Sequence, residues 1–357
     1  MIRAQNMSDV SAGLLSRPYF TYCIKFFLLI LLYSTFPKVV SAEQPVQIKL
    51  RLGDVSLNKL PFILAYDTGI YKRNGIDVLP MFTQGSVNTI RRSGIEVPDE
   101  FVLKNSDETP ICICGSSPTI VSLTTEAGAW DPLIIGSTHL TSRWRIVASK
   151  NINTREQLKG KRIGYSGVGS VSHVEAIMFA QQMGWDPDSD VSLMGDALAV
   201  EALQKGYVDA FVADELHETM AVGAGFKVIV DMAEYNLPVA GSGFAVDRVW
   251  FKNNPDAARR FIKSTVEAIA LLKKDKAAAY KTLAKWYQLT DPALLEYFYA
   301  KVDLIPRKPY APVEGLKKMM AIYDSHEMRK YKVEYFYDNS LVKELDDSGY
   351  IDSLYKQ

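Results

Sequence analysis

The sequence predicts an α/β protein of two lobes. Two observations carry this prediction: short apolar runs alternate with helical runs, and the helices begin directly after glycine and serine. Residues 160–184 contain the whole unit of strand, glycine-rich turn and helix, and residues 197–215 follow with a helix and a strand. A chain of 357 residues can bury a separate core in each of two lobes. We therefore expect each lobe to be a doubly wound sheet with flanking helices.

The composition excludes several classes of partner. Basic and acidic residues are balanced at 41 each, so no global field favours nucleic acid or an anionic membrane. The hydrophobic fraction of 48% is that of an ordinary globular protein. We expect no nucleic-acid partner.

Residues 1–42 are expected to be a secretory signal peptide. Basic residues come first, an apolar run follows at 26–32, and small residues stand at 40–42. The apolar run is short for a membrane span; a retained signal anchor is the alternative. Cleavage after Ala42 would leave a chain that does not span the membrane and is free in the periplasm.

The first elements after this leader read as strand, helix and strand. Apolar and polar residues alternate over 46–52, Asn58 opens a helix, and a second strand covers 76–82. Gln84 follows that strand, at the end where α/β sheets bind ligands. Asn58 and Gln84 are candidate ligand contacts, although a solvated loop position would explain Gln84 equally well.

Residues 91–110 are a charged stretch that we expect to be irregular. The alternation then resumes with a strand at 111–114 and a helix over 119–127. Ser116 and Ser117 stand at the start of this helix, where unpaired backbone N–H groups and the helix dipole attract an anionic or carbonyl group. Both serines are candidate ligand contacts.

Cys112 and Cys114 are the two cysteines that remain after the leader. Two positions apart in a strand, their side chains point to the same face, which suits a disulfide poorly. Two cysteines without a histidine cluster are also too few for a closed zinc site. We expect two small buried thiols; a strained or redox-active pair is the alternative.

The turn within residues 160–184 supplies a second candidate site. A strand at 163–165 runs into glycines, and Gly169 immediately precedes Ser170, a good N-cap. His173 follows within one turn, and Gly184 can close the helix in a left-handed conformation. The backbone N–H groups at Gly169 and Ser170 would hold an anionic or carbonyl group, with His173 lining the wall.

Two acids follow the next strand. Asp214 and Glu215 come directly after an apolar run at 208–213, so they should look into the same crevice as Ser170. They would suit a solute with an amine or ring N–H donors and disfavour a purely anionic one such as nitrate. Alternatively, the acids cap the next helix through its dipole.

Two sets of motifs carry a family resemblance. The motifs are Leu64-Ala65-Tyr66 with Gly69-Ile70-Tyr71-Lys72-Arg73-Asn74-Gly75, and Leu158-Lys159-Gly160-Lys161-Arg162-Ile163-Gly164 with Gly169-Ser170, Ala202-Leu203, Gly206 and Val208-Asp209-Ala210. In this order they resemble the solute-binding proteins of ABC importers, in particular the nitrate, taurine and alkanesulfonate group, which includes binders of thiamin-pyrimidine precursors.

The resemblance implies a two-lobed clamshell of the periplasmic-binding-protein type II, with two crossover strands as hinge. It places lobe 1 at residues 43–140 and 246–357 and lobe 2 at residues 141–245. Thr141 would then lie near the cleft floor and is a further candidate ligand contact. The helical remainder, beginning with 255–274, would return to lobe 1.

The resemblance also implies a function. The chain would be a monomeric periplasmic receptor that binds a sulfonate- or taurine-like or aminopyrimidine-like solute in the interlobe cleft and delivers it to a permease and its ATPase. Two alternatives remain open. The same clamshell could be the ligand-binding component of a sensor, or a pyrimidine-precursor biosynthetic enzyme, although this chain lacks the cysteine-rich motif of that enzyme.

The sequence offers little for catalysis. None of the four histidines has metal-binding spacing, and the glycine stretch is neither a phosphate loop nor a dinucleotide fingerprint. Ser170 and His173 could suggest a nucleophile and a base, but no Gly-x-Ser-x-Gly elbow or third partner accompanies them. We expect no catalytic residue, no metal and no cofactor.

Overall fold

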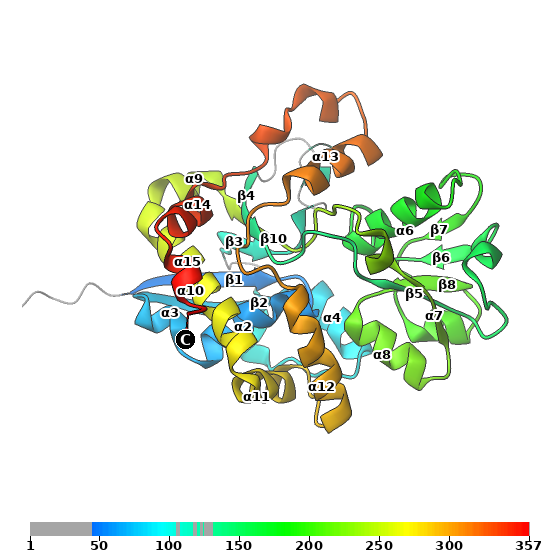
Figure 1. The fold of residues 1–357 in the computed structure, drawn as a ribbon, viewed down its shortest axis with the longest axis horizontal. Coiled ribbons are helices and arrows are strands. Elements are labelled where there is room, and N and C mark those ends of the chain that lie inside the picture. Colours follow the sequence, from blue (N-terminus) through cyan, green and yellow to red (C-terminus); the bar gives the residue numbers. More distant parts are fainter. Residues whose placement is uncertain (1–44, 105–107, 117–119, 122–123, 125–130, 357) are drawn as a thin grey trace, which may run out of the picture. The chain divides into compact units, whose positions relative to one another are not determined.

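The computed structural model describes residues 45–104, 108–116, 120–121, 124 and 131–356. These residues form two five-stranded sheets with helices around them, which confirms the predicted α/β class (Figure 1). Residues 1–42, the predicted signal peptide, lie outside the described residues. Within the described part of the chain, no helix combines the length and the apolar character that a membrane span requires.

The first sheet has the strand order β2-β1-β3-β10-β4. Strand β1 runs parallel to both β2 and β3, whereas β10 runs antiparallel to β3 and β4. The first three strands lie where the apolar patterns predict them. The strands are β1 (Val46–Leu52), β2 (Ile76–Phe82), β3 (Ile111–Ile113), β4 (Pro132–Ser137) and β10 (Gly243–Asp247).

The second sheet has the order β7-β6-β8-β5-β9. Strand β6 is parallel to β7 and β8, and β5 is antiparallel to β8 and β9. The chain therefore enters this sheet between β4 and β5 and leaves it between β9 and β10. The strands are β5 (Arg145–Ala148), β6 (Arg162–Gly164), β7 (Ser192–Met194), β8 (Ala210–Ala213) and β9 (Lys227–Asp231).

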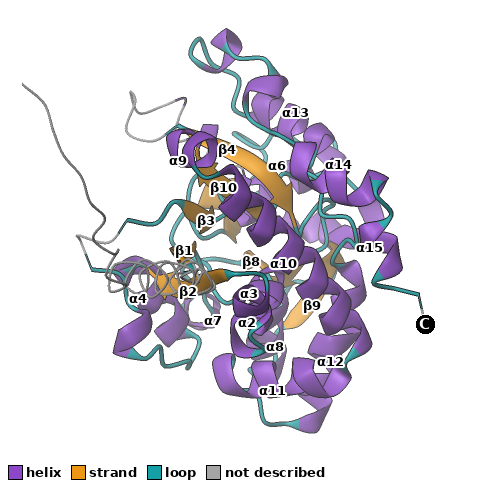
Figure 2. Ribbon diagram, turned by 90° about the vertical axis from the view of Figure 1, so that its left-hand side faces the viewer, coloured by secondary structure: helices purple, strands orange, loops and turns teal. Residues whose placement is uncertain are grey.

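Long helices cover the first sheet. Helix α10 packs on α2 and α3, which stand close together in Figure 2. Three phenylalanines form the centre of this core: Phe62 meets Phe244 edge-on at 5.0 Å between ring centroids and stacks on Phe261 at 6.1 Å. The helices on this side are α2 (Leu60–Asp67), α3 (Ile70–Arg73), α4 (Gln84–Arg92), α9 (Arg248–Asn253), α10 (Pro255–Lys274), α11 (Lys276–Trp286), α12 (Pro292–Ala300), α14 (Ser340–Asp347) and α15 (Tyr350–Ser353).

The second sheet carries three helices that follow its strands. The helices are α6 (Val171–Gln182), α7 (Val200–Gln204) and α8 (Glu215–Gly223). Helix α13 (Val313–Ile322) contacts elements of both sheets. Its Leu316 and Met319 share a hydrophobic cluster with Ile134 of β4, and the helix also packs against α6. Tyr323, just beyond it, packs against this cluster and against the core of the second sheet.

The charged stretch at 91–110 is irregular, as predicted, in the part that the structure describes. Helix α4 ends at Arg92, and a single helical turn at Asp99–Phe101 leads to Val102, which pairs with the end of β2. The ring of Phe101 lies 4.7 Å from that of Trp286. Through this aromatic contact, residues 99–102 pack against the end of α11.

The expectation of two separate thiols is wrong, because the structure joins Cys112 and Cys114 in a disulfide. Strand β3 ends at Ile113, so Cys114 has already left the extended conformation. The two Cα atoms are 5.3 Å apart, less than two residues of a strand would span and within the range that a disulfide bridges.

Candidate functional site

Two helices of the second sheet begin with the caps that the sequence predicts. Ser170 is the N-cap of α6, and its hydroxyl accepts a hydrogen bond from the backbone N–H of His173 at 3.2 Å. Asp214 is the N-cap of α8 and accepts from the N–H groups of Leu216 and His217 at 3.1 and 2.9 Å. Because β6 and β8 are parallel neighbours, both N-termini lie at the same edge of the sheet.

The carboxylate of Asp214 also binds a buried histidine. Its Oδ1 lies 2.8 Å from Nδ1 of His217. Burial pulls the pKa of His217 down, but the charge and hydrogen bond of Asp214 outweigh burial and raise it above its usual value. The same pairing outweighs burial in Asp214 and lowers the pKa of its carboxyl. Asp214 therefore acts as a helix cap and as the hydrogen-bond partner of the His217 ring.

Glu215 has a different environment from Asp214. It is 2% exposed, and burial raises the pKa of its carboxyl. Its nearest charge is the guanidinium of Arg143, whose Nε lies 3.5 Å from Oε1. Arg143 also donates through Nη2 to the side-chain oxygen of Asn58. Arg143 therefore links a residue of the second sheet's α8 to a residue of the first sheet's side.

Glu175 in α6 adds a second buried carboxyl. Its two oxygens accept from the backbone N–H groups of Arg143 and Trp144 at 3.4 and 3.3 Å. Burial raises its pKa to about 8. His139 lies 3.7 Å from this carboxyl, and burial, followed by the charges of Arg143 and Lys59, lowers the pKa of the imidazole.

We call these buried groups the charge cluster. Its members are Asn58, Lys59, His139, Arg143, Glu175, Asp214, Glu215 and His217, all less than 9% exposed. Lys59 completes it: the ammonium lies 2.9 Å from Asp54 and 3.1 Å from the hydroxyl of Ser242. Several polar atoms remain without hydrogen bonds within the described structure, including both carboxylate oxygens of Glu215 and Nε of Arg143. These atoms are also shielded from solvent. The cluster is therefore a closed contact between the two sides of the molecule.

Helix α8 strengthens that contact. Leu216 is 6% exposed and belongs to the hydrophobic core of the first sheet, although α8 follows a strand of the second. Two residues further along, Glu218 accepts a hydrogen bond from the hydroxyl of Tyr297 in α12 at 2.6 Å. His217 also approaches Ser93, after α4, at 3.5 Å. Helix α8 thus docks on the first sheet's helices.

A second group surrounds the start of α6, and we call it the histidine–tyrosine cluster. His173 stacks on Tyr165 with ring centroids 4.1 Å apart. The Nδ1 atom of His173 lies 3.2 Å from the backbone N of Gly169 and 2.7 Å from the hydroxyl of Tyr323. Burial lowers the pKa of His173 to about 4, so the ring is neutral at physiological pH. The members are Tyr165, Gly169, Ser170, His173 and Tyr323.

The first sheet meets this region through the chain after β3. Ser116 is fully buried, its backbone N–H donates to the carbonyl of Gly241 at 2.7 Å, and its hydroxyl has no partner among the described residues. A side chain at Gly243 would collide with that hydroxyl, so glycine permits the close approach. Ser117 lies outside the described residues.

Two predicted site residues are exposed and belong to neither cluster. Gln84 lies in the first turn of α4 and donates to Asn88 at 3.2 Å. Thr141 lies in the crossing between β4 and β5, opposite Pro238, and adjoins the charge cluster through a backbone hydrogen bond with His139. The structure therefore groups Asn58, Asp214 and Glu215 together, and Gly169, Ser170 and His173 together.

Seven members of the two clusters were not among the predicted site residues: Lys59, His139, Arg143, Tyr165, Glu175, His217 and Tyr323. Arg143 and Lys59 lie close in the sequence to Thr141 and Asn58, which were predicted as the ligand contacts of these segments. Glu175 carried a usable signal, because it lies four residues after Val171 and three before Met178, on the apolar face of α6. Tyr323 carried none, because 150 residues separate it from His173.

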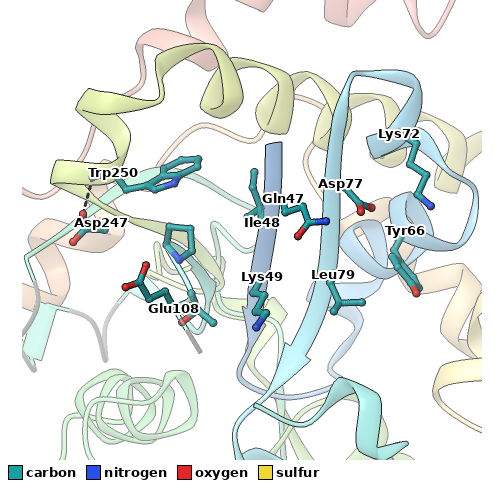
Figure 3. A pocket seen from close by; sticks show the side chains of 12 residues that line it. Gln47, Ile48, Lys49, Tyr66, Lys72, Asp77, Leu79, Glu108, Asp247 and Trp250 are labelled. Atoms are coloured by element: carbon teal, nitrogen blue, oxygen red, sulfur yellow. Dashed lines mark hydrogen bonds between the residues drawn. The ribbon is translucent and has the colours of Figure 1, made fainter. Parts of the chain in front are cut away.

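A large open hollow lies elsewhere on the first sheet. Its volume is about 820 Å³. Figure 3 shows Gln47, Lys49 and Asp77 on β1 and β2 at its floor, with Trp250 at one side. Its lining mixes lysines with acids and includes none of the candidate residues.

No group of three or more histidine, cysteine, aspartate or glutamate side chains within the described ranges is arranged to hold a metal ion. Ser170 is not aligned as a nucleophile for His173. Its hydroxyl accepts from the backbone N–H of that residue, while Nδ1 of the ring is occupied by Gly169 and Tyr323. The arrangement offers hydrogen bonds and helix N-termini for binding.

Solved structures share this architecture. The alkanesulfonate-binding protein SsuA from Xanthomonas axonopodis pv. citri, bound to MOPS, is 18% identical with a TM-score of 0.59, over 79% of this chain and 92% of that one. The periplasmic nitrate-binding protein NrtA from Synechocystis PCC 6803 is 14% identical with a TM-score of 0.64, over 85% and 89%. The chain has the periplasmic-binding-protein fold.

Sequence comparison agrees with this periplasmic-binding-protein fold. The family model described as NMT1/THI5 like matches residues 136–279, which include both crossings between the sheets. Among curated proteins, none matches the sequence. The family match and the sulfonate- and nitrate-binding structures together support the resemblance to the nitrate, taurine and alkanesulfonate group that the motifs predict.

The periplasmic-binding-protein fold also occurs in an enzyme. The desulfurization enzyme DszB is 16% identical with a TM-score of 0.54, over 84% of this chain and 99% of that one. The fold by itself therefore does not decide between receptor and enzyme.

Proposed function

We propose that this protein is the solute receptor of an ABC-type importer, which binds a small organic solute between its two sheets and delivers it to a membrane permease. The observation that carries the proposal is the contact between the N-terminus of α6 and the chain that follows β3 of the first sheet. Helix α6 begins at Ser170, and Gly169 beside it approaches Val121, in the helical chain after β3, so closely that a Cβ would lie 3.3 Å away. Helix N-termini are suited to anionic and carbonyl groups.

The lobe boundaries belong to the same proposal. Lobe 1 comprises residues 43–140 and 246–357, and lobe 2 comprises residues 141–245. Strands β1–β4 and β10 belong to the first sheet and β5–β9 to the second, which supports chain crossings between β4 and β5 and between β9 and β10. A cleavable signal peptide at residues 1–42 would release the receptor into the periplasm, where it would act as a monomer without a metal or cofactor.

The solute class follows from the chemistry of the two clusters. The N-terminus of α6 favours an oxygen-rich or carbonyl-like group, such as a sulfonate. The buried acids of the charge cluster are occupied by Arg143 and His217, so the case for an amine-binding role is weaker than the sequence suggests. A taurine-like sulfonate or an aminopyrimidine-like ring therefore remains the proposed solute, with Ser116, Ser117, Ser170 and His173 as contacts.

The first experiment is thermal unfolding of the purified protein against taurine, methanesulfonate, nitrate, 4-aminopyrimidine and putrescine. A solute that binds only the folded state, present at a hundred times its dissociation constant, stabilises by about 2.7 kcal/mol and raises the midpoint. The shift should vanish in His173→Ala. It should persist in Gln181→Ala, an exposed change near the far end of the same helix.

Two results would contradict the proposal. If no compound of a broad solute panel raises the midpoint of the wild-type protein, the receptor function fails. If a compound is consumed and a product appears, the protein is an enzyme on this fold.

A further inference from the structure

His173 has a hydrogen-bond arrangement that fixes the position of its ring proton. Nδ1 lies 3.2 Å from the backbone N of Gly169 and 2.7 Å from the hydroxyl of Tyr323. A backbone N–H can only donate, so Nδ1 must be an acceptor and carries no proton. The N–H of Gly169 is shared between Nδ1 and the hydroxyl oxygen of Tyr323, and that hydroxyl donates to the single lone pair of Nδ1. The neutral ring must therefore carry its proton on Nε2.

The surroundings of the ring keep it neutral. Its charged and titratable neighbours are Tyr165, on which it stacks, Tyr323, and Asp196 near Tyr165. None of the hydrogen bonds to His173 comes from a carboxylate within the described structure, in contrast to His217 and Asp214. Burial lowers the pKa of His173 accordingly.

The free nitrogen lies at the proposed solute site. His173 is in the first turn of α6, beside the N-cap Ser170, and its side chain is only partly buried. Nε2 has no hydrogen-bond partner among the residues that the structure describes, although Nδ1 has two. A donor is thus directed away from the Gly169–Tyr323 contact.

We propose that Tyr323 is a positioning residue which, together with the N–H of Gly169, holds His173 as an Nε2–H donor, so that the solute presents a hydrogen-bond acceptor to this ring. The acceptor is a sulfonate or carbonyl oxygen or an unprotonated ring nitrogen. The inference about the ring stands on the contacts of His173 alone, whereas the inference about the solute rests on the proposed receptor function.

Nitrogen-detected NMR of the purified protein without solute tests the ring directly. The signals of His173 are assigned by their loss in His173→Gln. Near neutral pH, Nδ1 should have the shift of an unprotonated ring nitrogen and Nε2 that of a protonated one. A proton on Nδ1, or a doubly protonated ring at neutral pH, would overturn the inference whatever the protein binds.

Tyr323→Phe separates positioning from packing, because it retains the aromatic ring and removes only the donor. The pKa of His173 should rise towards its ordinary value, because the neutral form loses an interaction, and a population with the proton on Nδ1 should appear. The control is Tyr331→Phe in the same C-terminal segment, whose ring packs on Tyr335 and Phe336. If neither variant changes the ring signals, Tyr323 is merely structural.

Small-molecule probes test whether the solute presents a hydrogen-bond acceptor to His173. Methanesulfonate supplies only oxygen acceptors, 4-aminopyrimidine supplies ring-nitrogen acceptors, and ethylammonium supplies only donors. A probe bound by the wild-type protein should bind about three- to tenfold more weakly to Tyr323→Phe, as expected for one misplaced hydrogen bond. Tight binding of ethylammonium alone would overturn the acceptor inference. Absence of binding by all probes would remove the solute inference together with the proposed function, while the NMR result would still decide the role of Tyr323.

Discussion

His217 and His173 are both withdrawn from solvent, yet their pKa values move in opposite directions. His217 is 8% exposed and pairs with the carboxylate of Asp214, which raises its pKa despite burial. His173 is bonded to a backbone N–H and a tyrosine hydroxyl, and burial lowers its pKa to about 4. Burial alone therefore does not decide the charge of a histidine. The hydrogen-bond partner decides it, so one cluster holds charge and the other holds a neutral ring.

The two clusters should also respond differently to mutation. The charge cluster contains ions that lose solvation and depend on each other, so removal of one member leaves the others unpaired. The histidine–tyrosine cluster contains neutral groups, whose single hydrogen bonds contribute about 1 kcal/mol each. The following predictions test this difference in order of expected effect.

Arg143→Ala should have the largest effect. It leaves Glu215 without its buried counter-charge and Asn58 without its donor. Removal of one partner of a buried pair costs about 3–5 kcal/mol, measurable by urea unfolding. The control is Arg155→Ala, whose surface pair with Glu234 should cost less than about 1 kcal/mol. A loss for Arg143→Ala as small as that of the control would show that the cluster is not electrostatically coupled.

Leu216→Ala should rank second. Leu216 is buried in the core of the first sheet, and a cavity at such a site costs about 2–4 kcal/mol. Val222→Ala in the same helix is the control, because Val222 is 50% exposed and should change stability by less than about 0.5 kcal/mol. Equal unfolding midpoints for the two variants would mean that α8 does not dock on the first sheet in solution.

Gly169→Ala should have a smaller effect, in the histidine–tyrosine cluster. Gly169 has φ +77° and Gly160 has φ +72°, so alanine at either position costs about 1–2 kcal/mol for the left-handed backbone. At Gly169 the added Cβ would also press on Val121 at 3.3 Å, whereas at Gly160 nothing lies within 4 Å. Denaturant unfolding should therefore show a greater loss for Gly169→Ala. A greater loss of stability for Gly160→Ala would show that the contact with Val121 does not destabilise Gly169→Ala.

The smallest effect concerns pH. The raised pKa of His217 contributes stability below the unfolded value of about 6.5, and this contribution is lost as pH rises through the folded pKa. The lowered pKa of His173 contributes stability above about pH 6.5, and this is lost as pH falls towards about 4. His217→Gln should therefore destabilise more in mild acid, and His173→Gln more in mild base.

Urea unfolding of both variants and the wild-type protein at several pH values above about 5 checks this, because the carboxyl of Asp214 titrates below that range. If the loss of unfolding free energy changes with pH in the same direction for both variants, the two histidines do not have opposite charge states.

Sequence reasoning succeeded where a short stretch determines the structure. Ser170 caps α6 and Asp214 caps α8 because a capping residue acts on N–H groups two or three positions away. Likewise, β1 and β2 follow from local apolar patterns. Strand β7 was missed because two of its three residues are exposed and only Leu193 is partly covered, so it carries no apolar run.

The contacts that build the two clusters could not be predicted in this way. Arg143 meets Asn58 across 85 positions, and Tyr323 meets His173 across 150. A single sequence records no sign of such pairs. The sequence therefore predicts the helix N-termini of the site, while the choice between charged and neutral surroundings depends on tertiary packing.

The disulfide between Cys112 and Cys114 has a consequence for how the protein meets other thiols. It closes a loop of only three residues, so the chain entropy that it removes from the unfolded state is well below the roughly 3 kcal/mol of a fifteen-residue loop. Its main effect is on reactivity, because it leaves no free cysteine thiol within the part of the chain that the structure describes. With this pair joined internally, these two cysteines would have fewer opportunities to form mixed disulfides with other proteins.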